Sequence, residues 1–546
     1  MVIDSAHGDF FSVFQSTPPP SLPTPASSPA TAPLPPAVAQ PLIHPVFDGS
    51  ASWWTQCLGH AHPALTLAAA HASGRYGHIL FPSATSLPSL SLAARLLDSV
   101  GRGWASRVFY SDDGSTGMEV ALKMALRSFA ERAGLKKEGS RELGVLGLKG
   151  SYHGDTIGAM DACEGGVFNE RVEWYAGRGF WLDAPSVRIE GAKAVVRMEE
   201  GPQAKERSTT YDTLEEVYEV ERRLKEDPLV EVYRAQIVGA LEERYKRGGI
   251  RFGTLILEPV VMGAGGMIFV DPLFQRILVD TVRTDRTLFP DSLPSDSPSH
   301  SPIDGTPIWR GLPIIFDEVF VGLRRLGRTN GSSFLGTYPD IACYAKILTG
   351  GLVPMAVTLA SDAIFRTFYG EHKIDSLLHG HSYTAHPIGC AVANKALEIM
   401  DGMEVKGTWE SAKENWGVET AVVAANPGGE IVEGGVWSLW DHDFAKTISS
   451  LSNVDGVMAL GTVLAIHLRA VDGAGYSSTA SESLLRQLRH GPSISSSPSA
   501  SPAGLPFNIH ARPLGNVVYF MSSLNSSPTT LRSVEAALLS ALLSTT

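Results

Sequence analysis

Two side chains of opposite charge stand in apolar surroundings, where ionised groups are costly. Asp317 closes the apolar run 312–316, and Lys346 lies inside a second apolar run, 341–348. A lysine flanked by apolar residues either extends its amine out of a core or is kept there for chemistry. A desolvated amine is neutral often enough to act as a nucleophile. Glu318 should point away from Asp317, because successive side chains of a strand alternate.

A small, polar loop opens a strongly helical segment earlier in the chain. The loop is Gly114-Ser115-Thr116-Gly117, and the segment MEVALKMALRSFA follows from its last glycine onward. A helix N-terminus presents free backbone N–H groups and the positive end of the helix dipole, which suit a phosphate. The dipole contributes only about 0.3–2 kcal/mol, so the N–H donors count at least as much. Taken alone, the loop is explained more simply as an ordinary Ser or Thr helix cap.

A third polar cluster follows the probable strand GVLGLKG. It contains Tyr152, His153 and Asp155, and such clusters at the carboxyl ends of strands collect ligand contacts in open α/β sheets. An alternative is that Asp155 or Thr156 only caps the next helix.

The tandem Trp53-Trp54 precedes a Gly-His-Ala-His-Pro loop. Two adjacent tryptophans on a strand cannot both face one core, so one is expected to face a pocket or a partner chain. Packing in the core and in an interface explains the pair equally well.

Together these residues predict a site for pyridoxal phosphate. The helix start would bind the phosphate, and Tyr152 would stack on the ring. Lys346 would condense with the cofactor aldehyde and later move a proton. Asp317 would keep the pyridine nitrogen protonated through a charge-assisted hydrogen bond, which lets the ring accept electrons when a Cα proton departs.

The site residues require a scaffold that brings several strand ends together. Apolar strands that alternate with helices predict an α/β fold with a mostly parallel central sheet. We expect strands that end at Glu258, at Asp317 and just before Lys346. Residues 1–14 are predicted to form two strands joined by a turn at His7-Gly8-Asp9.

Two further segments carry local predictions. Residues 190–250 are dense in Glu, Lys and Arg, which favours a surface insertion that carries a helix. The segment NIHARPLGNVVYFM near the C-terminus is predicted to be a turn between strands, with Arg512 at the turn.

The chain is predicted to form one large and one small domain. Residues 1–50 would start the small domain, residues 51–400 would form the large cofactor-binding domain, and residues 401–546 would complete the small domain as an α+β unit. The Pro-rich segment 17–41 cannot form a packed element and is predicted to be a disordered insertion. Two Ser/Pro-rich loops are expected at 291–306 and 490–506.

Composition excludes several classes of partner. The 546-residue chain has a net charge of −12 and a pI near 5.8, so neither nucleic acid nor an anionic membrane surface is attracted overall. Its apolar stretches are interrupted before they reach membrane-spanning length. The four cysteines are widely spaced, which argues against a disulfide framework or a structural metal site and fits an intracellular compartment. No targeting segment is visible, so the location is expected to be mitochondrial or cytoplasmic.

An ordered set of motifs resembles a known family. DDGSTGMEVALKMAL, SYHGDT, LEPVVMGAGGM, IIFDEVFVGLRRLGR, AKILTGG and HGHSYTAHP are similar to the motifs of class III (omega) aminotransferases. The resemblance covers about residues 48–400 and implies fold type I of the pyridoxal-phosphate enzymes. DGSASWWTQCLGHAHP, HGHSY and ARPLGNVVYFM are similar to the diaminopelargonate aminotransferases of biotin synthesis, as found in the eukaryotic fusion with dethiobiotin synthetase.

The resemblance implies a role for each matched residue. Lys346 becomes the Schiff-base lysine and Asp317 the partner of the pyridine nitrogen. Gly114 and Ser115 become phosphate ligands, while Tyr152 stacks on the cofactor.

Other implied roles concern the partner subunit and the substrates. Ser382 is implied to reach the phosphate of the neighbouring subunit's cofactor, which implies a homodimer with shared active sites. Arg512 is implied to hold a substrate carboxylate. The implied substrate pocket contains Trp53 or Trp54, Tyr152, Asp155 and Arg512.

The implied reaction transfers an amino group from S-adenosylmethionine to 8-amino-7-oxononanoate, which gives 7,8-diaminononanoate. Two alternatives stay open: another omega-aminotransferase of the ornithine or 4-aminobutyrate type, and a catalytically silent dimeric subunit. A dethiobiotin synthetase is an expected fused or separate partner, although its P-loop is not in this sequence.

The sequence departs from the family pattern in two respects. The family pocket uses an aromatic residue from a segment that would precede Val2. The family's Gly-Phe-Gly-Arg stands here as Gly322-Leu323-Arg324-Arg325, which leaves the role of Arg325 open.

Overall fold

The computed structural model describes residues 1–14, 42–81, 83–136, 139, 142–198, 207–247, 250–289, 311–418, 435–470, 473, 475–490 and 507–545. The Pro-rich segment 17–41 and the Ser/Pro-rich loop 291–306 lie outside the described residues. So does the loop 490–506 beyond its first residue.

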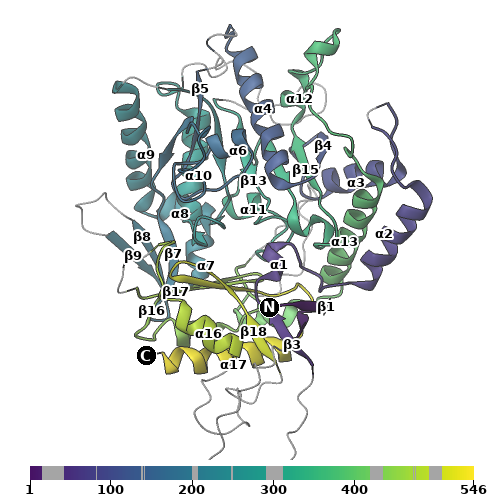
Figure 1. Cartoon of the computed structure of the whole chain (residues 1–546). Helices are drawn as coiled ribbons and strands as arrows, with labels where there is room; N and C mark the ends of the chain where they lie inside the picture. The colour runs from purple at the N-terminus through teal and green to yellow at the C-terminus, as the bar shows by residue number, and fades with distance from the viewer. Residues whose placement is uncertain are drawn as a thin grey trace, which may run out of the picture.

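A seven-stranded sheet forms the centre of the upper lobe in Figure 1. Four of its six strand pairings are parallel, and only β15 runs antiparallel to its neighbours β14 and β4. The predicted α/β fold with a mostly parallel central sheet is therefore confirmed. In sheet order the strands are β4 (Arg107–Ser111), β15 (Ala356–Ala360), β14 (Ile341–Tyr344), β13 (Ile314–Asp317), β10 (Arg251–Leu257), β5 (Leu143–Leu148) and β6 (Gly179–Leu182).

Helices cover this sheet because its inner strands are apolar on both faces. Every residue of β13, β14 and β15 is buried, which is the pattern of strands with helices above and below. Helix α4 (Gly114–Arg132) packs across β10, β13, β14 and β15. Other helices of this lobe (Figure 1) are α2 (Pro63–Tyr76), α3 (Leu87–Asp98), α6 (Ile157–Asp161), α8 (Val220–Glu226), α9 (Leu229–Lys246), α10 (Pro272–Thr284), α11 (Ser332–Leu335), α12 (Asp362–Arg366), α13 (Pro387–Val405) and the 3-10 turns η1 (Lys346–Thr349) and η2 (Lys373–Asp375). Helix α14 (Glu410–Asn415) instead contacts the lower lobe, where Asn415 donates a hydrogen bond to Asp441 at 3.0 Å.

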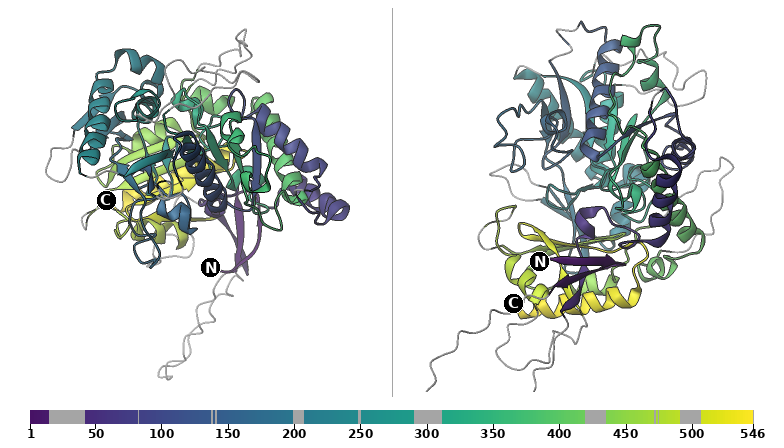
Figure 2. Two further views of the ribbon diagram at one scale, coloured as in Figure 1. Left: turned by 90° about the horizontal axis from the view of Figure 1, so that it is seen from above. Right: turned by 45° about the vertical axis from the view of Figure 1, so that its right-hand side comes forward.

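A second seven-stranded sheet lies in the lower lobe. In sheet order it contains β19 (Arg512–Leu514), β20 (Val517–Met521), β17 (Val463–Leu468), β16 (Val454–Leu460), β7 (Ser186–Glu190), β8 (Lys193–Met198) and β9 (Arg207–Tyr211). Its C-terminal strands thus pair with strands from 186–211, a segment inside the range expected for the large domain. Helices α15 (His442–Ile448), α16 (Glu482–His490) and α17 (Pro528–Ser544) pack in this lobe, with α17 along its lower side (Figure 2).

Two smaller sheets complete the described strands. The N-terminal hairpin β1 (Ile3–His7) and β2 (Phe10–Phe14) turns at Gly8 and Asp9, as predicted. It joins β3 (Ile43–Asp48) and β18 (Asn508–His510) in a four-stranded sheet. The short strands β11 (Val261–Met262) and β12 (Ile268–Phe269) form a separate antiparallel pair.

The prediction of a surface insertion with one helix at 190–250 is wrong. This segment holds β8 and β9 and the helices α7 (Leu214–Tyr218), α8 (Val220–Glu226) and α9 (Leu229–Lys246). Its charge is partly internal: Arg223 is 3% exposed and pairs with Asp271 at 2.6 Å and with Asp227 at 2.7 Å. In the sequence, charged residues that pair with one another inside the fold cannot be told apart from charged residues exposed to solvent.

The predicted position of Arg512 is also corrected. Arg512 is the first residue of β19, and the tight turn of the hairpin lies further on, at Gly515-Asn516. Arg512 stands opposite Tyr519 in this antiparallel pair.

Candidate active site

A cavity of about 650 Å³ lies at the carboxyl ends of β13 and β14, close to the short turn α1 (Ala51–Trp54), which sits between the two lobes (Figure 1). Carboxyl ends of neighbouring parallel strands are where α/β sheets bind ligands. Seven of the ten predicted site residues line this cavity: Trp54, Gly114, Ser115, Tyr152, Asp155, Asp317 and Lys346.

Lys346 follows β14 after one residue and starts η1 with a φ of +50°. That backbone region is costly for a residue with a Cβ, and such conformations gather at functional sites. Its Nζ lies 4.7 Å from the ring centroid of Trp54 and 5.5 Å from that of Phe320. Burial and, to a smaller extent, the positive charge of Arg325 lower the pKa of Lys346 to about 8. The amine is therefore neutral far more often than an exposed lysine.

Asp317 ends β13 and is fixed by His153, which was not among the predicted site residues. Its Oδ2 lies 2.8 Å from Nδ1 of His153, and its Oδ1 accepts a hydrogen bond from the Val319 N–H at 3.1 Å. The His153 side chain is fully buried. Among the described residues, its Nε2 has no hydrogen-bond partner. Because a carboxylate oxygen only accepts hydrogen bonds, the His153 ring donates Nδ1–H to Asp317 in this contact.

The first turn of α4 forms another wall of the cavity. Asp113 caps this helix by accepting a hydrogen bond from the Thr116 N–H at 2.9 Å. Gly114 and Ser115 precede Thr116 and line the cavity, and N–H groups at these positions have no acceptor within a helix. A Cβ at Gly114 would lie 2.8 Å from the Val319 side chain, so this turn approaches the segment after β13 closely only because Gly114 has none.

Tyr152 and Glu258 meet at the ends of β5 and β10. Glu258 accepts hydrogen bonds from the N–H groups of Tyr152 and Gly263, both at 2.9 Å. Burial and then the charge of Asp317 raise the pKa of Glu258 to about 7. Glu258 lines the cavity but was not among the predicted site residues, although it ends an apolar strand just as Asp317 does.

Glu318 has a separate environment from its neighbour Asp317. Both of its carboxylate oxygens lie 2.9 Å from the Gly331 N–H, and it is not part of the cavity lining. Burial raises the pKa of Glu318 to about 8. This placement agrees with the alternation expected at the end of the strand.

The tryptophan pair lies on a left-handed turn. Ala51, Ser52, Trp53 and Trp54 have φ angles from +46° to +71°, although none of them is glycine. Asp48, which is 4% exposed, holds the turn. It accepts hydrogen bonds from the Ser50 N–H at 3.1 Å and the Ser52 N–H at 2.7 Å, and it lies 2.9 Å from His60 Nε2.

The left-handed turn sends the two indole rings to different places. Trp54 is 4% exposed, lines the cavity and packs against Phe320. The buried side chain of Arg325 donates hydrogen bonds to the carbonyl oxygens of Trp54 and Phe320. Burial lowers the pKa of Arg325 to about 10. Trp53 is 61% exposed, and the Arg512 guanidinium lies 3.9 Å from its ring centroid.

Three predicted site residues are not part of the cavity lining. Trp53 and Arg512 stack on each other outside it, and Ser382 is exposed on the segment before α13. His153, Glu258, Phe320 and Arg325 are the additions that the structure makes. His153 could have been predicted from the sequence, because it lies in the Tyr-His-Gly-Asp cluster that follows a strand.

Comparison with known proteins identifies the family. The family model described as "Aminotransferase class-III" matches residues 44–171 and 310–414, which contain most of the cavity lining. The chain is 31% identical to adenosylmethionine-8-amino-7-oxononanoate aminotransferase of Synechococcus elongatus, over 65% of this chain and 67% of that protein.

Two longer relatives match nearly the whole chain. The bifunctional dethiobiotin synthetase/adenosylmethionine-8-amino-7-oxononanoate aminotransferase of Emericella nidulans is 45% identical over 542 residues, or 99% of this chain. The mitochondrial bifunctional dethiobiotin synthetase/7,8-diamino-pelargonic acid aminotransferase of Oryza sativa subsp. japonica is 37% identical over 95% of this chain. The chain spans 63% of the first protein's length and 55% of the second's.

A solved structure supports the same fold. Adenosylmethionine-8-amino-7-oxononanoate aminotransferase from Methanocaldococcus jannaschii aligns with a TM-score of 0.66 at 20% identity, over 100% of this chain and 93% of that one. The predicted fold class is confirmed, and the chain belongs to the class III aminotransferases.

Proposed function

We propose that this chain is a pyridoxal-phosphate-dependent aminotransferase that moves an amino group from S-adenosylmethionine to 8-amino-7-oxononanoate, a step of biotin synthesis. The observation that carries the proposal is the convergence of Lys346, Asp317 and the first turn of α4 on one cavity. The choice of substrates rests on the 45% identity, over 99% of this chain, with the fungal bifunctional enzyme.

The donor set of the cavity fits pyridoxal phosphate. The N–H groups of Gly114 and Ser115 would hold the phosphate, and the Tyr152 ring would cover one face of the pyridine. Asp317 would hold the ring nitrogen, and Lys346 the aldehyde carbon. The volume of about 650 Å³ is that of a small-molecule site. When bound, the cofactor supplies an electron sink for the bond that breaks at the substrate carbon.

The chain's own residues supply proton transfer and orientation. Lys346, with a pKa of about 8, can take a proton from the substrate carbon and return it at neutral pH. Asp317 would hold the proton of the cofactor's ring nitrogen, because its carboxyl group is fixed by His153 and the Val319 N–H. Trp54 and Phe320 surround the lysine amine with apolar surface and exclude water from that side.

Substrate recognition is assigned to Arg512, which lies outside the cavity lining, and to Asp155, which is part of it. Arg512 carries the charge that would hold a substrate carboxylate, and its stacking on Trp53 orders the guanidinium plane. Asp155 is an exposed acid in the cavity lining and would face the polar part of a substrate.

We infer that two copies of the chain share their active sites. Ser382 is exposed, does not line the cavity of its own chain, and has exposed apolar neighbours in Leu378 and Tyr383. Such a surface suits an interface in which Ser382 reaches the phosphate of the partner's cofactor.

A dethiobiotin synthetase is proposed as a fused or separate partner, because the fungal and rice relatives carry that activity in their names. The name of the rice relative supports a mitochondrial location over a cytoplasmic one. Within the described residues, no helix is both long enough and apolar enough to cross a membrane.

One experiment distinguishes the proposed donor from the alternatives. The cofactor-loaded protein is mixed separately with S-adenosylmethionine, ornithine and 4-aminobutyrate, and the visible absorbance of the lysine-bound cofactor is followed. Loss of the band with S-adenosylmethionine alone is expected. Loss with ornithine or 4-aminobutyrate but not with S-adenosylmethionine would refute the biotin assignment, and no response to any amine would favour a silent subunit.

A further inference from the structure

An aromatic strip continues from the cavity lining to the molecular surface. The ring of Tyr152, which lines the cavity, lies 5.1 Å from the ring of Phe168. Phe168 in turn lies 5.7 Å from Tyr476, with the two rings at 77°. Phe168 is 38% exposed and Tyr476 is 53% exposed. Because the second contact is edge to face, the strip leaves ring surface open to a ligand.

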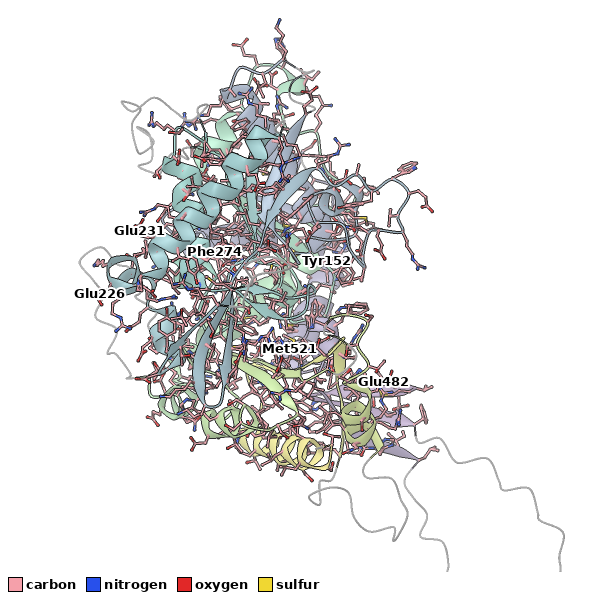
Figure 3. All side chains as sticks on the ribbon, turned by 90° about the vertical axis from the view of Figure 1, so that its left-hand side faces the viewer. Tyr152, Glu226, Glu231, Phe274, Glu482 and Met521 are labelled. Carbon is pink, nitrogen blue, oxygen red and sulfur yellow. The ribbon has the colours of Figure 1, made fainter. Side chains whose placement is uncertain are left out.

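The strip joins the two lobes. Phe168 follows α6 in the upper lobe, whereas Tyr476 belongs to the segment 475–481 that leads into α16 in the lower lobe. Figure 3 labels Tyr152 in the upper lobe and Glu482, the first residue of α16, in the lower lobe. A large planar ligand bound here would therefore contact both lobes.

Tyr476 is held by the same hairpin that carries Arg512. The Gly475 N–H donates to Oδ1 of Asn516 at 2.9 Å, and Asn516 Nδ2 donates to the Leu468 carbonyl at 3.1 Å. Asn516 forms the turn between β19 and β20, and Arg512 is the first residue of β19. The same hairpin thus carries Arg512 and, through Asn516, holds the segment of Tyr476.

The two proposed substrates require two kinds of recognition at that edge. In each substrate, the carbon that reacts must lie near Lys346. The donor and the acceptor must therefore be distinguished by the end of the molecule that points away from Lys346. The acceptor ends in a carboxylate, which suits Arg512. The donor ends in a purine nucleoside, which a carboxylate-binding arginine does not select and which open aromatic rings bind by stacking.

We propose that Phe168 and Tyr476 form a subsite for the purine ring of the amino donor and make the site selective for a nucleoside-bearing donor. This inference rests on the proposed function. It assigns the distal end of the donor to the aromatic strip and the distal end of the acceptor to Arg512.

The test uses 5′-methylthioadenosine, which keeps the purine nucleoside but has no amine to transfer. Its binding to the cofactor-loaded protein is measured by calorimetry for the wild type, Tyr476→Ala, Tyr476→Phe and Phe168→Ala. Each alanine variant is expected to bind about tenfold more weakly, since one stacked aromatic ring contributes about that factor or more. Tyr476→Phe should retain wild-type binding, because stacking needs the ring and not the hydroxyl.

Tyr338→Ala is the matched control. Tyr338 is 41% exposed, but it precedes β14 and so lies at the amino end of that strand, away from the cavity. Its replacement should leave binding unchanged. In steady-state kinetics, Tyr476→Ala should raise the KM for S-adenosylmethionine about tenfold and leave the KM for 8-amino-7-oxononanoate within twofold.

Three outcomes overturn the inference while the proposed function stands. In the first, the wild-type protein reacts with S-adenosylmethionine without binding the nucleoside. In the second, the alanine variants bind the nucleoside as tightly as the wild type. The third outcome is an equal rise in the KM values for S-adenosylmethionine and 8-amino-7-oxononanoate. Wild-type protein that does not react with S-adenosylmethionine overturns the proposed function itself.

Discussion

At the scale of single residues, the cavity sets the protonation of its groups through burial more than through ion pairs. Lys346 has a pKa of about 8 and Glu258 one of about 7, and burial is the larger cause in both. Arg325 is buried without a carboxylate among the described ion pairs, and its charge acts on Lys346 in the same direction as burial. The resemblance left the role of Arg325 open. Its hydrogen bond to the Trp54 carbonyl indicates that Arg325 helps to hold the left-handed turn of Ala51–Trp54.

Replacing Arg325 should change the titration of Lys346. The rate at which cofactor-free protein takes up pyridoxal phosphate should rise with pH through about 8, because only the neutral amine reacts. In Arg325→Met the midpoint should move to higher pH, since a positive charge that disfavours the protonated amine is removed. The measurement is the initial uptake rate, followed by visible absorbance between pH 6 and 10.

Arg324→Met is the control for this prediction. Arg324 is adjacent in sequence but pairs with Glu404 at 2.6 Å. Its replacement should leave the midpoint of the wild type unchanged. An unshifted midpoint in Arg325→Met would remove Arg325 from the control of Lys346.

At the scale of secondary structure, the sequence predicts the strands that carry the site but not the turn that completes it. Asp317 and Lys346 could be placed at strand ends because β13 and β14 are short apolar runs that stop at a charged or small residue. The left-handed turn of Ala51–Trp54 opposes the local preference of all four residues, at about 1–2 kcal/mol each. Its causes are contacts with Asp48, which local propensity does not register, and with the distant Arg325.

Asp48→Asn should destabilise the protein by about 2 kcal/mol at pH 7, because a carboxylate that accepts several buried hydrogen bonds is lost. Burial opposes the ionisation of Asp48, but hydrogen bonds from His60 and Ser50 outweigh it and lower its pKa. A lowered pKa contributes stability that is present above the unfolded value of about 4 and is lost as pH falls through the folded value. The difference in the free energy of unfolding between wild type and variant, measured in urea, should therefore shrink as the pH falls into the acid range.

Asp455→Asn serves as the control, because Asp455 is exposed and its ion-pair distance to Arg469 is 3.5 Å. It should change the free energy of unfolding by less than about 0.5 kcal/mol at any pH. If Asp48→Asn lowers the free energy of unfolding by the same amount from pH 7 to pH 3, the proposed role of the Asp48 carboxylate charge is contradicted.

At the scale of the whole molecule, the cavity of one chain holds seven predicted site residues, and Ser382 is exposed elsewhere. The sequence predicted the mostly parallel central sheet from alternating strands and helices. It could not predict that strands from 186–211 join the C-terminal sheet, since pairing between distant segments leaves no local pattern. A single chain also does not show which of its surfaces would contact a second copy in a dimer.

Mixing two inactive variants tests whether active sites are shared. Lys346→Ala and Ser382→Asp should each be inactive alone, because one lacks the amine and the other repels the phosphate of the partner's cofactor. After unfolding and refolding together, half of the dimers should be mixed and each should contain one intact site, which gives about a quarter of wild-type activity. Activity no higher than the sum of the separate variants would argue against shared sites.

The central claim is that Lys346 is the covalent anchor of pyridoxal phosphate in this cavity. The most direct measurement is reduction of the cofactor-loaded protein with sodium borohydride, followed by peptide mapping with mass spectrometry. One pyridoxyl-phosphate label is expected, on the peptide that contains Lys346, and it should be lost in Lys346→Ala. A label on exposed lysines such as Lys123, with none on Lys346, would contradict it.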